Sequence, residues 1–181
     1  GLSRLGRFED ASLALEELRA LNLPGPVVAL FDASLAFRSG ELDSAEAELS
    51  EAMKKFGGLA DTSQHEVLLG LVRASKGDAP EGRRVLEKYR DTRRFRDDLA
   101  NLALVVGEPE EALSLIERTL MARNYRWLAT NPYAKPYLDR PDFRALAERL
   151  HREWRDNLEI LKGRLPAAPP DLPEPEALHG S

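Results

Sequence analysis

Glycine recurs in this chain at a spacing that predicts a repeated helical joint. Gly6, Gly40, Gly77 and Gly107 are separated by 34, 37 and 30 residues, and each is followed five positions later by Ala or Gly. We interpret each of these glycines as the end of a helix, because a residue without a Cβ adopts the left-handed C-cap conformation at least cost. Acidic residues follow the last three, joined by Pro after Gly77 and Gly107, as expected at the positive end of a new helix. The chain is therefore predicted to consist of helical hairpins.

Two further offsets from the last three glycines support this interpretation. A small residue lies seven positions before each glycine, and Leu or Ile lies nine positions after it. The small residues are Ala33, Gly70 and Ala100, and the large ones are Leu49, Leu86 and Ile116. We expect the residue five positions after each glycine to lie where two antiparallel helices approach closely, and the large residues to face a shared core.

Composition places the chain in the all-α class. Apolar residues make up 43% of the chain and charged residues 31%, whereas aromatic residues make up only 7%. No alternating run of β-branched and aromatic residues is long enough to predict a strand. We expect helices over 7–22, 26–39, 42–56, 62–76, 79–91, 94–106, 109–123, 125–130 and 141–163.

These joints resemble the tetratricopeptide repeat family, whose helical hairpins stack into a right-handed superhelix with a concave groove. The resemblance covers residues 5–123 as one half-repeat and three hairpins, with Gly82 where the family usually has Ala. It implies a protein-binding or scaffolding module. Because residues 7–22 match the second helix of a hairpin, we expect the partner of this helix to be missing.

A second resemblance lies in residues 127–150. It is to the segment that closes the repeat domains of many bacterial multidomain regulators and kinases, and it is carried by residues at matching separations: Trp127, Pro132, Pro136, Pro141, Phe143 and Leu146. The three prolines predict an extended, kinked path whose aromatic side chains cover the last hairpin. The alternative is an aromatic recognition patch.

Leu and aromatic residues at helical spacing predict a long C-terminal helix with one apolar side. They are Phe143, Leu146, Leu150, Trp154, Leu158 and Leu161. This side is expected to pack on the repeats, and pairing with a second copy is the alternative. We therefore divide the chain into repeats over 1–123, a capping segment with its helix over 124–165, and a Pro-rich tail over 166–181 that we expect to lack fixed structure.

Nothing in the sequence indicates catalysis, a metal or a cofactor. His65, His151 and His179 are far apart, and His65 is expected to be exposed; no phosphate-binding loop or nucleophile motif is present. A cluster of basic residues between Arg83 and Arg96 is interspersed with acidic ones. We interpret it as a solvated face of ion pairs and not as a nucleic-acid site.

The expected function is recognition in the groove, which in the repeat family is lined by the first helix of each hairpin. That resemblance nominates Val27, Phe31, Ser34, Phe37, Gln64, Leu68, Arg94, Asp98 and Asn101. Leu30, Val67 and Leu71 also align there, but each is equally consistent with ordinary core. The nominated set is largely apolar with a polar rim at one end, which favours an amphipathic helix or an extended apolar segment as partner.

The expected partner is a protein or peptide, within a larger bacterial regulatory protein, with self-association or a purely structural spacer as the alternatives. Neither nucleic acid nor membrane is expected as a partner, since the net charge is −5 and no apolar stretch approaches the roughly 20 residues that cross a bilayer. We expect the protein in the cytoplasm; the absence of cysteine also leaves the periplasm open.

Overall fold

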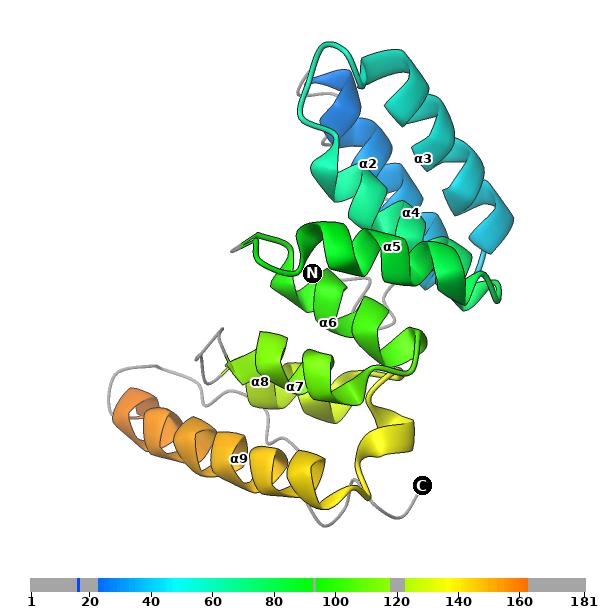
Figure 1. Ribbon diagram of the computed structural model, residues 1–181. Coiled ribbons are helices and arrows are strands. Elements are labelled where there is room, and N and C mark those ends of the chain that lie inside the picture. Colours follow the sequence, from blue (N-terminus) through cyan, green and yellow to red (C-terminus); the bar gives the residue numbers. More distant parts are fainter. Residues whose placement is uncertain (1–15, 17–22, 93, 118–122, 163–181) are drawn as a thin grey trace. The chain divides into compact units, whose positions relative to one another are not determined.

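All the regular elements in the part of the chain that the structure describes are helices. The computed structural model describes residues 16, 23–92, 94–117 and 123–162 (Figure 1). The elements are α2 (Gly25–Arg38), α3 (Leu42–Phe56), α4 (Ser63–Ser75), α5 (Ala79–Tyr89), α6 (Arg96–Val105), α7 (Pro109–Glu117), α8 (Arg123–Thr130), the 3-10 helix η2 (Lys135–Tyr137) and α9 (Pro141–Lys162). This confirms the all-α class for these residues.

The predicted helices agree closely with the observed ones. Their described ends differ by at most two residues, and the predicted end of the helix over 109–123 falls beside residues that are not described. Within the predicted helix over 7–22 only Glu16 is described, and it is helical. The rest of that helix, its joint at Gly6 and the Pro-rich tail over 166–181 lie outside the described residues.

The described chain forms two compact units. Unit 1 ends at Val106 and contains α2 to α6, and unit 2 begins at Gly107 and contains α7 to α9. This division lies within the third predicted hairpin, whereas the sequence placed a boundary after residue 123.

The three described joint glycines have the left-handed backbone that their spacing predicts. The φ angles of Gly40, Gly77 and Gly107 are 85°, 103° and 81°. At the end of α2, the Gly40 N–H donates to the Phe37 carbonyl at 3.1 Å, and the next N–H donates to the Ala36 carbonyl at 2.9 Å. These bonds satisfy carbonyl groups that the last turn of a helix otherwise leaves without partners. The prediction of glycine C-caps is confirmed for Gly40, Gly77 and Gly107.

The residues at the recurring offsets are buried, as predicted. The small ones are Ala33, Ala45, Gly70, Gly82, Ala100 and Ala112, and the large ones are Leu49, Leu86 and Ile116. Gly70 shows why small residues are needed, because a Cβ placed on it would lie 2.9 Å from the Cβ of Val85. The side chain of Val85 on α5 therefore fills the space that a side chain at Gly70 on α4 would need.

Helix α4 occupies the centre of unit 1. It packs against α3, α5 and α6 and touches α2, and every residue from Val67 to Val72 is buried. A helix that is apolar on all sides is typical of a core position. α2 and α3, in contrast, pack on each other at one end of the described part of unit 1 (Figure 1).

Unit 2 is organised around α9, which packs against α8. The predicted apolar side of α9 is buried at Phe143, Leu146, Leu150 and Leu158. Tyr125 of α8 is also fully buried, and its ring centroid lies 4.6 Å from that of His151. The sequence did not indicate this ring contact, because a single His among charged residues gives no periodic signal. The side chains of Trp127 and Leu161 lie outside the described part.

The path of residues 131–140 differs from the prediction. We expected an extended segment, but the chain forms consecutive turns and the short helix η2. The Asn131 side chain starts the first turn by accepting a hydrogen bond from the Tyr133 N–H at 2.9 Å. Tyr137, at the end of η2, then stacks on Phe143 with 5.7 Å between ring centroids. Proline is compatible with turns and with the first turn of a helix. Pro132 and Pro136 therefore lie in a turn and in η2, and not in an extended segment.

Candidate protein-interaction site

The clearest candidate surface is an apolar stripe on α2. α2 begins at Gly25, with Pro24 as its N-cap. Val27 and Phe31 are four residues apart on this helix, so they lie one turn apart on the same side. Of their surfaces, 38% and 47% remain exposed. The buried residues of α2, Ala33 and Ala36, lie on its opposite side. We call Val27 and Phe31 the α2 stripe.

The other nominated residues of α2 lie beside the stripe and are half-buried. The Ser34 hydroxyl donates to the Leu30 carbonyl one turn earlier at 2.7 Å, so it is engaged within its own helix. Phe37 is half-buried near the end of α2. The apolar character of the surface therefore comes mainly from Val27 and Phe31.

The nominated residues of α4 do not extend the stripe as an open apolar surface. Leu68 is buried in the core of unit 1, and Gln64 is half-buried in the first turn of α4. Val67 and Leu71, which the sequence left open between groove and core, are fully buried. The central position of α4 explains this, because three neighbouring helices cover it.

Arg94, which forms the polar end of the nominated set together with Asp98 and Asn101, takes part in a contact between two loops. Arg94 precedes α6 and does not lie on it, and its Nη1 donates to Asp61 Oδ2 at 2.6 Å. The Arg94 guanidinium also lies over the ring of Phe95, which has a left-handed φ of 60°. Asp98 and Asn101 are half-buried on α6. Hydrogen bonds from the Ser63 hydroxyl and from Arg94 hold the pKa of Asp61 well below its ordinary value.

His65 is buried, so the prediction that it is exposed was wrong. Its Nε2 lies 2.8 Å from the carbonyl oxygen of Pro26. A carbonyl oxygen only accepts, so Nε2 carries the proton and donates. This bond fastens the start of α4 to the start of α2. The sequence missed it because hydrogen bonds between residues 39 positions apart leave no local pattern.

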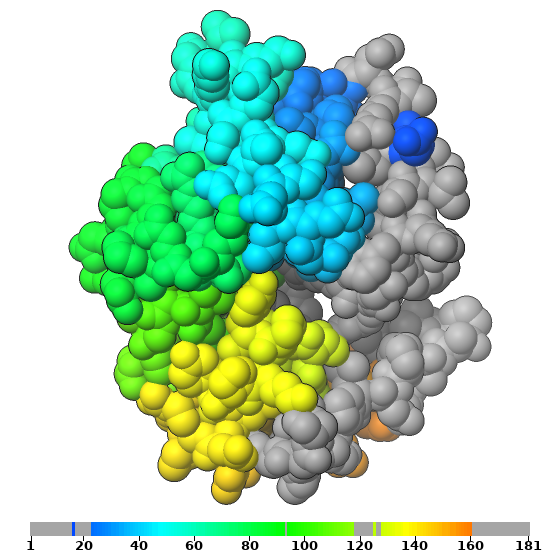
Figure 2. Space-filling model, turned by 90° about the vertical axis from the view of Figure 1, so that its right-hand side faces the viewer, coloured from blue at the N-terminus to red at the C-terminus, as the bar shows by residue number. Residues whose placement is uncertain are grey.

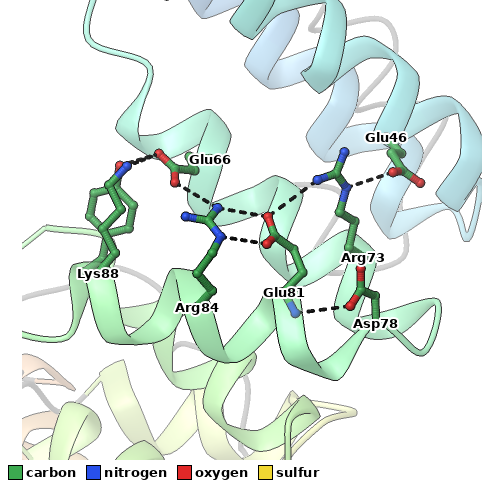
Figure 3. A network of polar contacts seen from close by, with 8 residues as sticks. Glu46, Glu66, Arg73, Asp78, Glu81, Arg84 and Lys88 are labelled. Atoms are coloured by element: carbon green, nitrogen blue, oxygen red, sulfur yellow. Dashed lines mark hydrogen bonds and ion pairs between the residues drawn. The ribbon is translucent and has the colours of Figure 1, made fainter.

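The basic cluster of the sequence takes part in a network of ion pairs on α4 and α5, which reaches α3 through Arg73 (Figure 3). Arg84 donates to Glu81 at 2.7 Å and to Glu66 at 3.3 Å, and Lys88 donates to Glu66 at 2.7 Å. Tyr89 also donates to Glu66, at 2.8 Å. The positive charges of Arg84 and Lys88 are thus balanced by carboxylates of the same surface.

The carboxylates of this network favour their charged form. Burial alone would raise the pKa of Glu66, but hydrogen bonds from Lys88 and Tyr89 outweigh burial and leave the pKa below its ordinary value. The hydrogen bond from Arg84 lowers the pKa of Glu81. Lys76 and Arg73 likewise lower the pKa of Glu46 on α3.

We expect unit 1 to lose stability in acid because of these carboxylates. Their pKa values are lower in the folded state than in the unfolded chain, so their contribution is present above the unfolded value of about 4.3. It is lost as the pH falls through the lowered values. Urea unfolding followed by circular dichroism from pH 7 to pH 3 should show this decrease.

The change Glu66→Gln should remove part of that dependence. At pH 7 it should lower the free energy of unfolding by about 1 kcal/mol, since charge-assisted hydrogen bonds are partly offset by solvent screening. The exposed Glu51, on α3, offers a matched control, and Glu51→Gln should change the free energy of unfolding at pH 7 by less than about 0.5 kcal/mol. Equal losses of stability at pH 7 in the two variants would contradict the role of Glu66.

The described residues offer neither a metal site nor a membrane-spanning helix. They contain no group of three or more His, Cys, Asp and Glu side chains that could hold a metal ion. None of their helices combines the length and the apolar character that crossing a membrane requires. No protein-family model, curated protein or solved structure matches this chain.

Proposed function

We propose that this chain is a non-catalytic protein-interaction module in which the α2 stripe holds a peptide or a helix of a partner. The exposure of Val27 and Phe31 on one side of α2 carries this proposal. Aromatic side chains are enriched among the residues that contribute most to protein interfaces. Burying this pair under a partner would remove apolar surface from water, which is the main favourable term in association.

The proposed contact surface is smaller than the set of residues that the sequence nominated. Leu68 belongs to the core and is left out of the proposed contact surface. This surface consists of the α2 stripe and of polar side chains on α4 and α6, namely Gln64, Asp98 and Asn101. A stack of tetratricopeptide type, with a right-handed superhelix and a concave groove, is part of the same proposal. It is supported by the glycine joints and by the buried small residues at recurring offsets. The resemblance of residues 127–150 to closing segments supports a place in a larger bacterial regulatory protein.

Substitution of Phe31 should weaken binding of the partner while the chain remains folded. Because about half of its surface is exposed, Phe31→Ala should change the free energy of unfolding by less than about 1.5 kcal/mol. Loss of a central aromatic contact should cost about 2 kcal/mol of binding, which corresponds to roughly 30-fold in affinity. Asn101→Ala should weaken binding without preventing folding. Circular dichroism and partner titration measure the two effects.

A photo-crosslinking amino acid at position 27 tests the surface whatever the identity of the partner. In cells of the source organism we expect a covalent adduct with a second protein, and Phe31→Asp in the same chain should abolish it. The matched control carries the crosslinker at Lys135, an exposed residue of unit 2. An adduct of twice the mass of the chain would instead assign the stripe to self-association. Equal labelling at both positions would refute the proposal.

A further inference from the structure

The charges of α3 are paired at one end of the helix and unpaired at the other. Near its start, Asp43 and Glu46 bind Lys76 at 2.5 and 2.7 Å. In its last turn, Lys54 and Lys55 are exposed and form no ion pair with any residue that the structure describes. Two adjacent cations without a counter-charge attract acidic groups from outside the chain.

The loop that follows these lysines presents an apolar side chain to solvent. Leu59 is the most exposed large apolar residue in the described part, with 86% of its surface accessible. The loop containing it lies at the upper end of unit 1 in Figure 1, and atoms of this region protrude at the top of Figure 2. An apolar side chain in this position has no core to face.

Hydrogen bonds on both sides of Leu59 fix the loop. The N–H groups of Leu59 and Ala60 both donate to the Phe56 carbonyl, at 2.8 and 2.9 Å. Asp61 then accepts from the Ser63 N–H at 2.9 Å and from Arg94 at 2.6 Å. A partner that binds a fixed loop loses less conformational entropy than one that must first order it.

The neighbours of this loop that the structure describes form no ion pair with the two lysines. Phe56 lies against the start of α2, where a Cβ on Gly25 would be 2.8 Å from its ring. The ammonium of Lys55 lies 5.2 Å from the centre of the Phe56 ring, a contact that leaves its positive charge in place. Glu51, one turn earlier on α3, is the nearest carboxylate along the chain, and no ion pair joins it to Lys54 or Lys55 in the described part. Asp61, in the loop, is engaged by Ser63 and Arg94.

We propose that Lys54, Lys55 and Leu59 form a second docking surface, for a protein segment in which a large apolar side chain lies beside acidic residues. The apolar side chain contacts Leu59 and the acidic residues face the two ammonium groups. A protein segment fits better than an anionic membrane, because two lysines contribute only about 1 kcal/mol each at a membrane surface. The net charge of −5 would also oppose approach to anionic lipids. This surface shares no residue with the α2 stripe.

A phage-display selection tests this surface. The full chain serves as the bait, and the library displays random 12-residue peptides. Peptides that bind the chain but not the triple variant Lys54→Glu, Lys55→Glu and Leu59→Ser should combine Asp or Glu with a large apolar residue. Leu59→Ser alone should weaken a selected peptide about tenfold, and the lysine reversals together should weaken it about tenfold or more. Exchange of the acidic residues of the peptide for Lys should restore binding to the Lys54→Glu, Lys55→Glu variant.

The control variant is Lys135→Glu, an exposed charge reversal in unit 2 that should leave peptide affinity unchanged. Circular dichroism checks that each variant keeps its helix content, since all the substituted side chains are exposed. The proposal is overturned if the triple variant selects the same peptides with equal affinity, or if the discriminating peptides lack acidic residues. It is also overturned if no peptide discriminates and the chain binds phosphatidylserine vesicles through these residues.

Discussion

Replacing Phe143 by Ala should lower the free energy of unfolding of unit 2 by about 3–5 kcal/mol. Phe143 is fully buried in the first turn of α9 and stacks on Tyr137. Its removal leaves a cavity where the turns of residues 131–140 join the helix. Both tryptophans of the chain, Trp127 and Trp154, belong to unit 2, so their fluorescence during urea unfolding reports on this unit.

The matched control is Ile160→Ala on the same helix. Ile160 is exposed over 60% of its surface, so its truncation should change stability by less than about 1 kcal/mol. Phe143→Ala should also leave binding at the α2 stripe unchanged, because that stripe belongs to unit 1. Similar effects of the two variants on stability would show that Phe143 does not anchor the segment that precedes α9.

Replacing Gly82 by Leu should destabilise unit 1 by about 3 kcal/mol. A Cβ at this position would lie 2.6 Å from Val106 Cγ1 and 2.8 Å from the Cβ of Ala74. A Leu side chain would therefore force α5 away from α4 and from the end of α6. Urea unfolding followed by circular dichroism measures the loss.

Two further variants test whether close packing around Gly82 causes the expected loss of stability in Gly82→Leu. Gly82→Ala should be less harmful than Gly82→Leu, because the greater helix propensity of Ala, worth about 1 kcal/mol, offsets part of the clash. Gly58→Ala is the control, since no atom lies within 4 Å of its Cβ position. It should be neutral within about 0.5 kcal/mol. If Gly82→Leu were equally neutral, the close approach at Gly82 would be contradicted.

Gly82 also shows which parts of the fold could be predicted from the sequence. A joint that repeats every 30 to 37 residues has a local cause, the left-handed backbone after each helix, and so its glycines could be identified. The reason for Gly instead of Ala at position 82 lies in Val106, whose side chain fills the space of a methyl group. That side chain is 24 positions away, and no local pattern reveals it.

The candidate site was only partly predictable for a similar reason. The exposed pair Val27 and Phe31 follows from helical spacing on α2, whereas the burial of Leu68 depends on how many helices surround α4. A nomination taken from the first helix of each hairpin cannot distinguish an outer helix from a central one. Arg94 was likewise placed on a helix, but it lies in the loop before α6, where Asp61 holds it.

The bond between His65 and Pro26 has a consequence for how the chain folds. It joins residues 39 positions apart, and each other side-chain hydrogen bond or ion pair described above spans fewer residues. Closing such short loops costs little chain entropy, and folding rates rise as contacts become more local. Unit 1 can therefore assemble by adding one helix at a time to its neighbour, so that each hairpin has its stabilising contacts soon after it emerges from the ribosome.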